Sequence, residues 1–264
     1  MTIDTREFAG KAAVVTGTTG IGRAIALRLS AGGAQVTGFG IDEQANRELA
    51  SRAKDEGLTL IAELCDVADP QAVESAVQQA VRHMGGIDIL VNAAAIHPFG
   101  DVVETEPEIW NRCMAINVSG VYLLARAVIP VMRQRGGGCI LNLASVQGYA
   151  CQRGVAAYAA SKGAIHSLTR ALALDHAKDR IRVNSISPGS VRTPMLATSA
   201  AHFSPGMATD EVFARFGAAH PLGRIGTPGE IAELAAFLAS ERSGFCTGSD
   251  FVADGGLLAG LGLS

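Results

Sequence analysis

The chain has 264 residues, of which 48% are hydrophobic and 18% charged, and its formal net charge is −3. This length suits one large α/β domain over residues 1–264 better than two small ones, because such a domain buries a substantial core around a single sheet. The scattered basic residues argue against nucleic-acid binding, and the five cysteines, with no pair two residues apart, argue against a disulfide framework or a zinc knuckle.

Short apolar runs rich in β-branched residues alternate along the chain with longer segments of helical spacing. In chain order, the expected elements are strand 12–15, helix 21–29, strand 34–39, helix 43–56, strand 58–64, helix 70–84, strands 87–91 and 139–143, helix 158–174 and strand 181–186. Strands that are apolar on both faces belong in a parallel sheet covered by helices on each side. The predicted fold is therefore a single-domain, Rossmann-like, doubly wound parallel sheet.

The segment Pro194–Pro221 breaks this alternation, because Ser, Ala, His, Pro and Gly interrupt any clear period. A long irregular segment inside a compact domain is usually a functional lid or is partly disordered. We expect residues 194–221 to form an irregular lid over a substrate.

A glycine-rich turn follows the first expected strand and leads into an Ala-rich helix; its sequence is Thr16-Gly17-Thr18-Thr19-Gly20-Ile21-Gly22. Glycines there let the backbone approach a pyrophosphate, whose charge is favoured by the free N–H groups and the positive dipole end of the helix. The turn predicts a dinucleotide phosphate site at Gly17, Thr19, Gly20, Ile21 and Gly22. It does not match G-x-G-x-x-G literally, and a plain tight connection is the alternative.

Polar residues follow the next two parallel strands at the carboxyl edge, where such sheets bind ligands. Asp66 follows the third expected strand and Asn92 ends the fourth. Together with Val67, Ala93 and Ala94, they are predicted to contact the same nucleotide. A helix cap or turn for Asp66 and a turn side chain for Asn92 are the structural alternatives.

Tyr158 and Lys162 are four residues apart, about one helical turn, so that the phenol and the ammonium project from one face. Ser145 closes the fifth strand at the carboxyl edge, where its hydroxyl can hold a substrate carbonyl that the phenol protonates. Tyrosine has an ordinary pKa near ~10, and a cation ~4 Å away favours the phenolate by roughly 4 kcal/mol, or about three pKa units at most. We therefore expect Lys162 to lower the pKa of Tyr158, although an isolated Tyr/Lys pair is more often surface decoration.

These residues resemble the short-chain dehydrogenase/reductase family, in the branch whose chains are about as long as this one. The likeness runs nearly end to end, and Asn117, Ser145, Tyr158 and Lys162 fit the family's Asn-Ser-Tyr-Lys tetrad in order and approximate spacing. The resemblance implies that Asn117 holds a water in a proton relay from Lys162. It also implies that Tyr158 and Lys162 contact the cofactor, Lys162 through the nicotinamide ribose.

The segment after the sixth strand resembles the family's nicotinamide-contacting loop, which implies cofactor contacts at Pro188, Gly189, Val191 and Thr193. Two other segments depart from the family pattern. The glycine turn has two residues between its first two glycines, where family members usually have three, and Asn92-Ala93-Ala94-Ala95 stands where the family has Asn-Asn-Ala-Gly. Both departures concern cofactor binding and leave the tetrad intact.

The end of the second strand bears on the choice of nicotinamide cofactor. An acid there accepts hydrogen bonds from the adenosine ribose and repels a 2′-phosphate, whereas an arginine does the reverse. The family's acid position aligns with Gly40, but Asp42 is close and no Lys or Arg precedes Arg47. We predict NAD as the preferred cofactor, with NADP as the alternative. A simple N-cap for the helix that begins near Glu43 is the other interpretation of Asp42.

The predicted function is an oxidoreductase that transfers a hydride between the nicotinamide cofactor and a secondary alcohol or ketone. Ser145, Gln147 and Tyr158 are expected to contact the substrate, and polar groups at His97 and Gln147 favour a small polyol or sugar. A catalytically silent nucleotide-binding sensor or scaffold on the same fold is one rival, which the shortened glycine turn favours. A hydrolase with Ser145 as nucleophile is a weaker rival, because no G-x-S-x-G surrounds that serine.

The remaining expectations concern partners and location. No apolar run approaches the roughly 18 residues of a membrane span, and the polar residues 1–11 lack the apolar centre of a secretory signal. We expect a cytoplasmic protein with a small-molecule substrate and no membrane, nucleic-acid or metal partner. The family resemblance implies a homotetramer built on two long helices and a C-terminal contact, and the apolar residues 257–263 fit burial against a neighbour or against their own chain.

Overall fold

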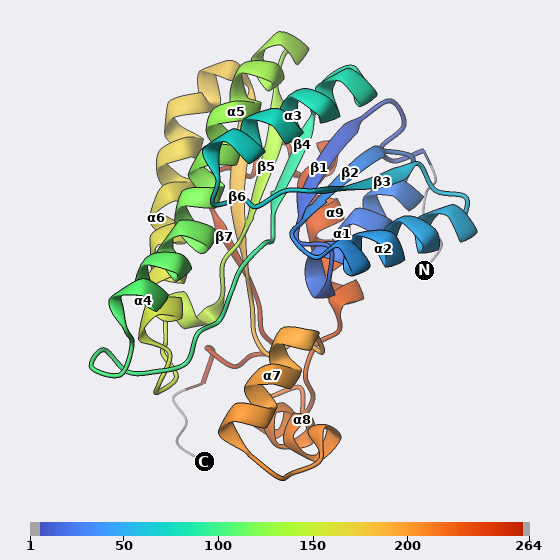
Figure 1. Ribbon diagram of the computed structural model, residues 1–264. Coiled ribbons are helices and arrows are strands. Elements are labelled where there is room, and N and C mark those ends of the chain that lie inside the picture. The colour runs from blue at the N-terminus through green and yellow to red at the C-terminus, as the bar shows by residue number, and fades with distance from the viewer. Residues whose placement is uncertain (1–5, 261–264) are drawn as a thin grey trace.

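The computed structural model describes residues 6–260, and within them it contains a seven-stranded parallel sheet of order β3-β2-β1-β4-β5-β6-β7 (Figure 1). The strands are β1 (Ala12–Thr16), β2 (Gln35–Gly40), β3 (Leu60–Leu64), β4 (Ile89–Asn92), β5 (Gly138–Leu143), β6 (Ile181–Pro188) and β7 (Asp250–Ala253). This doubly wound order confirms the predicted fold. Residues 1–5 and 261–264 of the expected 1–264 domain, including part of the apolar tail, lie outside the described residues.

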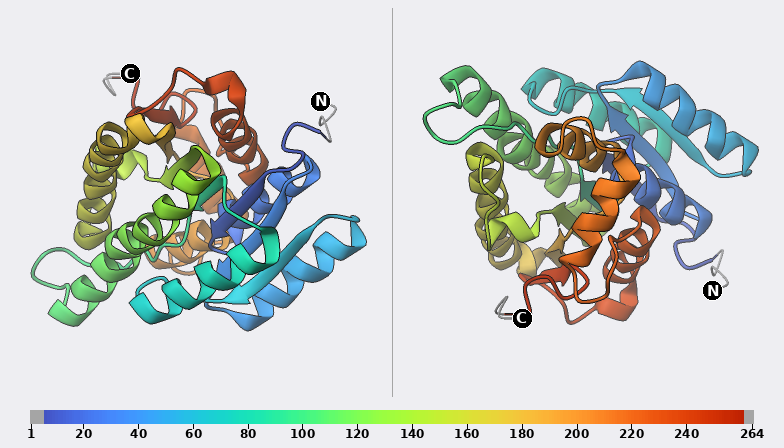
Figure 2. Two further views of the ribbon diagram at one scale, coloured as in Figure 1. Left: turned by 90° about the horizontal axis from the view of Figure 1, so that it is seen from above. Right: turned by 90° about the horizontal axis from the view of Figure 1, so that it is seen from below.

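Two layers of helices cover the sheet, because successive strand residues point to opposite faces. On one face, Ala13 and Val15 pack with α1 (Gly20–Ala31), α2 (Glu43–Asp55) and α9 (Pro228–Ala239). On the other face, Val14 packs with α3 (Pro70–Met84), α5 (Gly120–Arg135) and α6 (Ala156–His176). The view from above in Figure 2 shows the sheet between these two layers.

The helical stretch Pro107–Arg135 is long and apolar enough to span a membrane by length and composition alone. It consists of α4 (Pro107–Met114), the π-helical turn η1 (Ala115–Ser119) and α5. In α5, Leu124, Val128 and Met132 are buried in the core against the sheet. The apolar character of this stretch is therefore accounted for in part by packing within the domain.

Residues 194–221 are mostly helical, so the prediction of an irregular segment is wrong. They contain α7 (Pro194–Phe203) and α8 (Thr209–Ala218). The side chain of Thr193 caps α7, and Pro194 occupies the first helical position, where its missing N–H costs nothing. Each helix has only ten residues, too few to show a clear apolar period, and they pack around a small core of Ala200, Val212, Phe213 and Ile225. The view from below in Figure 2 shows the two helices, in orange, lying across the carboxyl edge of the sheet.

The order in which the strands are added reverses between the neighbouring strands β1 and β4. The connections that follow these two strands pass to opposite faces of the sheet, and they leave a crevice between them at the point where doubly wound folds bind ligands. The 3₁₀ segment η2 (Val146–Gly148) follows β5 at the same edge. The glycine turn, η2 and the helices α7 and α8 therefore all meet at one edge of the sheet.

Candidate active site

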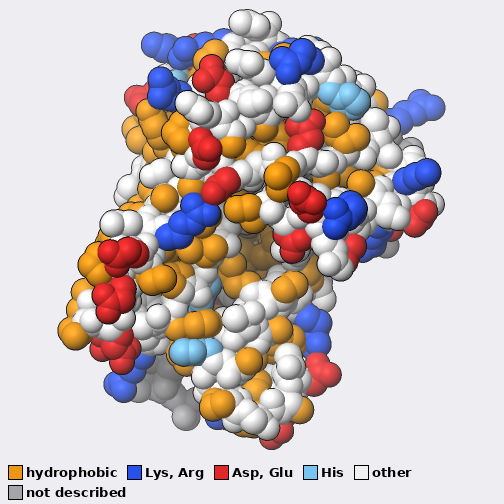
Figure 3. Space-filling view, in the orientation of Figure 1, with side chains coloured by type: hydrophobic (Ala, Val, Ile, Leu, Met, Phe, Trp, Pro, Cys, Tyr) orange, Lys and Arg blue, Asp and Glu red, His pale blue; other side chains and the backbone are white. Residues whose placement is uncertain are grey.

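A cavity of about 940 Å³ lies at this edge, between the carboxyl ends of the strands and α7. Figure 3 shows the corresponding hollow between the body of the molecule and the α7/α8 segment. The cavity is lined by most of the predicted site residues: Gly17, Thr19, Gly20, Ile21, Gly22, Asp42, Asp66, Val67, Ala93, Ala94, Ser145, Gln147, Tyr158, Lys162, Pro188, Gly189, Val191 and Thr193. Segments far apart in sequence thus form one site.

The glycine turn forms one end of the cavity and is shaped by close backbone contacts. A Cβ added to Gly22 would lie 2.0 Å from the carbonyl oxygen of Gly17, and Gly17 itself has a φ of 83°. The N-cap residue Thr19 makes no side-chain hydrogen bond to the first turn of α1, and that turn has no acidic residue. The N–H groups and positive dipole end of α1 therefore face the cavity without a competing carboxylate, which suits a pyrophosphate.

The shortened turn is matched by a glycine on the neighbouring strand. Thr18 is buried, and its Oγ1 would lie 2.2 Å from a Cβ added to Gly40; Asn46 Oδ1 would lie 2.4 Å from the same Cβ. Asn46 Nδ2 donates to the carbonyl oxygen of Gly40, at 3.0 Å. Thr18 of the shortened turn thus occupies the space above Gly40. The short turn and the absence of an acidic side chain at position 40 belong to one packing arrangement.

Asp42 and Asp66, both predicted to contact the cofactor, line the cavity. Each also has the structural role that was its alternative, a helix cap for Asp42 and a turn for Asp66. Asp42 caps α2, accepting from the N–H groups of Gln44 at 2.8 Å and Ala45 at 3.1 Å. Asp66 accepts from the N–H of Ala68, and its carboxylate pairs with Arg112 at 2.9 Å. Both carboxylates are therefore fixed in position at the edge of the site.

The structure places Asn92 away from the cavity lining. Its Nδ2 donates to Asn142 Oδ1 at 2.9 Å, and Asn142 Nδ2 donates to Thr169 Oγ1 at the same distance. This buried chain of bonds joins β4, β5 and α6. Asn92 therefore helps to hold β4 and β5 to α6 and is absent from the cavity lining, and its contact with a nucleotide stays a prediction.

Tyr158, Ser145 and Lys162 lie together at the other end of the cavity and are all buried. The Lys162 Nζ lies 5.4 Å from the centroid of the Tyr158 ring and donates to the carbonyl oxygen of Leu143 at 2.6 Å. Ser145 caps η2 by accepting from the N–H of Gln147, at 3.1 Å, which fixes its hydroxyl beside the phenol. The predicted juxtaposition of phenol, ammonium and strand-end hydroxyl is present.

The expected lowering of the tyrosine pKa is not present. Burial raises the pKa of Tyr158 to about 12, although the hydrogen bond from Ser145 acts in the opposite direction. Burial also lowers the pKa of Lys162 to about 8. The expectation took account of the charge of the lysine but not of the removal of both groups from water, which disfavours the charged form of each.

Comparisons with known proteins agree with this geometry. A family model described as enoyl-(acyl carrier protein) reductase matches residues 15–258. An uncharacterized oxidoreductase from Thermotoga maritima is 38% identical over 250 residues, covering 94% of this chain and 96% of that protein. The chain belongs to the short-chain dehydrogenase/reductase family. It is an oxidoreductase of that family, whose members use a nicotinamide cofactor.

Two solved structures of this family are also similar. A single-residue variant of actinorhodin polyketide ketoreductase, solved with NADPH, has a TM-score of 0.90 and 34% identity, covering 94% of this chain and 97% of that chain. The ligand-free aldohexose dehydrogenase from Thermoplasma acidophilum has a TM-score of 0.89 and 31% identity, covering 98% of each chain. The shortened glycine turn therefore sits within an otherwise ordinary short-chain dehydrogenase/reductase fold.

Asn117, the remaining member of the tetrad, lies behind the cavity wall in the π-helical turn η1. Its Oδ1 accepts from the N–H of Ile96, and its Nδ2 donates to the carbonyl oxygen of Ile96, both at 2.9 Å, and to Ser161 Oγ at 3.0 Å. The Ser161 hydroxyl in turn donates to the carbonyl oxygen of Tyr158. Asn117 thus joins the segment after β4 to the helix that carries the tyrosine and lysine.

Several residues of the cavity wall were not predicted from the sequence: Thr18, Ala95, Ile96, Arg112, Phe216, Leu257 and Leu258. Most are apolar, and three of them, Phe216, Leu257 and Leu258, come from α8 or the C-terminal segment, so no motif marks them. The residues Leu257 and Leu258 show that this part of the apolar tail folds back on its own chain. No group of three or more His, Cys, Asp or Glu side chains within residues 6–260 is arranged to hold a metal ion.

Proposed function

We propose that this protein transfers a hydride between NAD and a secondary alcohol or its ketone, with Tyr158 as acid and base. The observation that carries this proposal is the meeting of the glycine turn with Tyr158, Ser145 and Lys162 in one cavity. That cavity fits a dinucleotide, because its phosphate end is bare backbone and its other end holds a proton donor.

The bound nicotinamide supplies or accepts the hydride. In the reductive direction, Tyr158 gives its phenolic proton to the carbonyl oxygen while Ser145 orients that oxygen; in oxidation, the phenolate takes the alcohol proton. Lys162 supplies the nearby positive charge that stabilises the phenolate. The proposal includes a water relay that leads from Lys162 through Asn117. The Asn117 side chain bonds Ile96 and Ser161 and so positions the helix that carries Tyr158 and Lys162.

The proposed preference for NAD rests on charge at the adenosine end of the cavity. Asp42 is held there by its bonds to the first turn of α2, and Arg112 is paired with Asp66. Among the described residues that line the cavity at this end, no cation is left to pair with a 2′-phosphate. A phosphate there would face the carboxylate of Asp42. The polyketide ketoreductase was solved with NADPH, so NADP is the competing outcome of the test.

The substrate is proposed to be a small polar polyol or sugar, or the corresponding ketone. His97 and Gln147 bring polar groups to a wall that is otherwise mostly apolar. The name of the Thermoplasma acidophilum structure, an aldohexose dehydrogenase, supports the same class. The silent sensor or scaffold draws no support from the glycine turn, because α1 still begins at Gly20 and the turn still lines the cavity.

We further propose a cytoplasmic homotetramer that assembles through α5 and α6. Tyr122 on α5 is 50% exposed and Leu174 on α6 is 81% exposed, and large apolar side chains in such positions favour contact with another chain. Light scattering at several concentrations tests the assembly: a mass of four chains supports it and a monomer mass excludes it.

The test of the function is absorbance of reduced nicotinamide with a panel of polyols, sugars, steroids and acyl-thioester ketones, with NADH and NADPH compared side by side. We expect turnover with polar secondary alcohols or ketones, a higher kcat/KM with NADH, and loss of turnover in Tyr158→Phe while cofactor binding is retained. Turnover in a correctly folded Tyr158→Phe protein would exclude the role given to the phenol. A higher kcat/KM with NADPH would exclude the NAD preference.

A further inference from the structure

Two polar side chains in the cavity wall near Tyr158 have buried atoms without a hydrogen-bond partner among the described residues. They are the Nδ1 atom of His97 and the Oε1 atom of Gln147. Unsatisfied buried polar atoms are rare in native proteins, and each calls for an explanation. Both occur at the substrate end of the same cavity, which suggests that a ligand completes their hydrogen bonding.

The His97 ring is held firmly beside the catalytic tyrosine. Its centroid lies 4.2 Å from that of Tyr158, with the rings inclined at 61°, and 5.1 Å from that of Phe99. Phe99 stacks on His202 of α7 at 3.9 Å and contacts Phe203 at 5.4 Å. This set of rings runs from Tyr158 to the lid. It fixes His97 where a substrate group near the reacting carbon would meet it.

The His97 imidazole is neutral at physiological pH. Burial lowers the pKa of His97 to about 4; a hydrogen bond with its own backbone opposes this shift, and the charges of Lys162 and His202 add to it. A neutral imidazole has one donor and one acceptor nitrogen. It suits an uncharged hydroxyl, which also donates and accepts, better than a carboxylate or phosphate.

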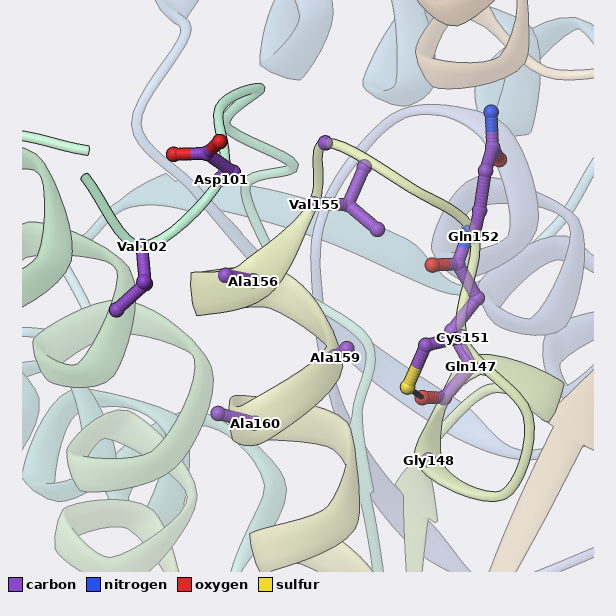
Figure 4. Close-up of a pocket in the computed structure, with 11 residues that line it drawn as sticks. Asp101, Val102, Gln147, Gly148, Cys151, Gln152, Val155, Ala156, Ala159 and Ala160 are labelled. Atoms are coloured by element: carbon purple, nitrogen blue, oxygen red, sulfur yellow. Dashed lines mark hydrogen bonds between the residues drawn. The ribbon is translucent and has the colours of Figure 1, made fainter. Parts of the chain in front are cut away.

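Gln147 stands two residues after Ser145, and its N–H donates to the Ser145 hydroxyl. It borders the main cavity and a second one of about 430 Å³, which is also lined by the first turns of α6. Figure 4 shows this second cavity between Gln147, Cys151 and the helix residues Ala156 and Ala159. The thiol of Cys151 donates to the backbone carbonyl of Gln147, at 3.7 Å, so Gln147 is anchored through its backbone while its Oε1 is left as an acceptor.

We propose that His97 and Gln147 bind a hydroxyl on the carbon next to the reacting carbon, so that the substrates are vicinal diols and α-hydroxy ketones. This inference rests on the proposed function and narrows its substrate class. Ser145 and Tyr158 hold the reacting oxygen, Gln147 is two residues from Ser145, and His97 touches the Tyr158 ring. A group bound by both therefore lies at the same end of the cavity as the reacting carbon, and a hydroxyl on the neighbouring carbon is the simplest such group.

The reaction balances for this class. In reduction, the carbonyl carbon of the α-hydroxy ketone gains a hydride from the reduced nicotinamide, and the C=O π bond becomes a C–O single bond. The oxygen gains the proton of Tyr158, which is restored from solvent. The products are a vicinal diol and the oxidised nicotinamide, and the neighbouring hydroxyl is unchanged.

The experiment compares matched substrates that differ by the one hydroxyl: acetoin against butan-2-one, and butane-2,3-diol against butan-2-ol. We expect kcat/KM to be at least about tenfold higher for the hydroxylated member, as a well-formed hydrogen bond allows. In His97→Phe, which keeps an aromatic ring, and in Gln147→Leu, this ratio should fall by about tenfold. The fall should come from weaker turnover of the hydroxylated substrate.

Two surface variants on α3 are matched controls, His83→Phe and Gln79→Leu, because both residues are exposed far from the cavity. They should keep the wild-type ratio, and melting temperatures establish that each variant is folded. Equal kcat/KM for the two members of a pair overturns this inference and leaves the proposed function standing. If neither member of a pair is turned over and no other secondary alcohol or ketone is accepted, both this inference and the proposed function are overturned. The wild-type ratio alone decides the matter if a variant fails to fold.

Discussion

The two ends of the cavity are built in opposite ways. At the phosphate end, Gly17, Gly22 and Gly40 let backbone or a neighbouring side chain approach so closely that an added Cβ would clash. At the chemical end, buried side chains from different elements bond one another, as Asn117 does with Ser161. A substitution that adds atoms should therefore disrupt cofactor binding at the phosphate end. A substitution that removes a polar group should disrupt turnover at the chemical end. Single-residue variants and a pH profile test this contrast.

Removing the buried cation should have the largest effect. In Lys162→Met, the phenol of Tyr158 loses its positive neighbour and the carbonyl of Leu143 loses its donor. We predict a fall in kcat of about 10³-fold, within the usual range for loss of acid–base function. Steady-state kinetics at saturating cofactor measure it. The matched control is Lys178→Met at an exposed position, which should be silent; a Lys162→Met protein with more than a tenth of wild-type kcat would contradict the role of the ammonium.

Adding one methyl group should damage the phosphate end. A Cβ at position 22 would meet the carbonyl oxygen of Gly17 at 2.0 Å and that of Thr16 at 2.8 Å, so the turn must open. We predict that Gly22→Ala weakens cofactor binding by about 100-fold, in line with overpacking costs of roughly 1–3 kcal/mol. Gly229→Ala in α9 is the control, because its Cβ would meet nothing closer than 3.9 Å. Titration calorimetry measures both, and unchanged affinity in Gly22→Ala would remove the phosphate site from this turn.

These two regions also differ in how far the sequence alone could describe them. The 3.6-residue helical period is enough to put Tyr158 and Lys162 on one face, and strand ends are enough to bring Ser145 and the glycine turn to one edge. The raised pKa of Tyr158 could not be predicted, because it depends on how completely the folded chain excludes water from the phenol. A pattern of letters does not measure burial.

The packing of Thr18 over Gly40 could not be predicted from the sequence either. The shortened turn and the glycine at position 40 are separate departures from the family pattern, and nothing in the sequence shows that the two residues are in contact. The helices α7 and α8 were missed for a different reason. Their caps, such as Thr193 before Pro194, are visible in the sequence, but ten residues give too few apolar positions to establish a period. The bonds of Asn92 toward α6 could not be predicted either, because a strand-end position does not say on which side of the sheet a side chain lies.

The pH dependence of alcohol oxidation tests the pairing at the chemical end. Tyr158 and Lys162 are treated as a coupled pair. Loss of one proton gives either a phenolate beside an ammonium or a phenol beside a neutral amine, and the two forms carry the same number of protons. The first proton therefore leaves the pair with a single apparent pKa. With the pKa of Lys162 lowered to about 8 by burial, kcat/KM for oxidation should rise about tenfold per pH unit below 8 and level off above it. In Lys162→Met, the plateau should disappear up to pH 10 or so, because burial raises the pKa of Tyr158 to about 12. A flat profile from pH 6 to 9 in the wild-type protein would contradict this pairing.

The smallest expected effect is at the adenosine end. Asp42→Ala should lower the ratio of NAD to NADP efficiency by about tenfold, because it removes one charge that faces a 2′-phosphate. It should also cost about 1 kcal/mol of stability through loss of the helix cap. Asp69→Ala removes an equivalent cap on α3, with bonds to Gln71 and Ala72, and serves as the control. Equal cofactor ratios in the two variants would show that Asp42 is only a cap.

The most direct test of the proposed chemistry follows the hydride itself. Reduced NAD deuterated at C4, in each of its two stereoisomers, is supplied with an accepted ketone, and the product alcohol is examined by mass spectrometry and NMR. We predict deuterium on the former carbonyl carbon from one stereoisomer with the wild-type protein, and no product above background with a folded Tyr158→Phe protein that still binds the cofactor. Product without the label, or labelled product formed by Tyr158→Phe at the wild-type rate, would contradict this chemistry.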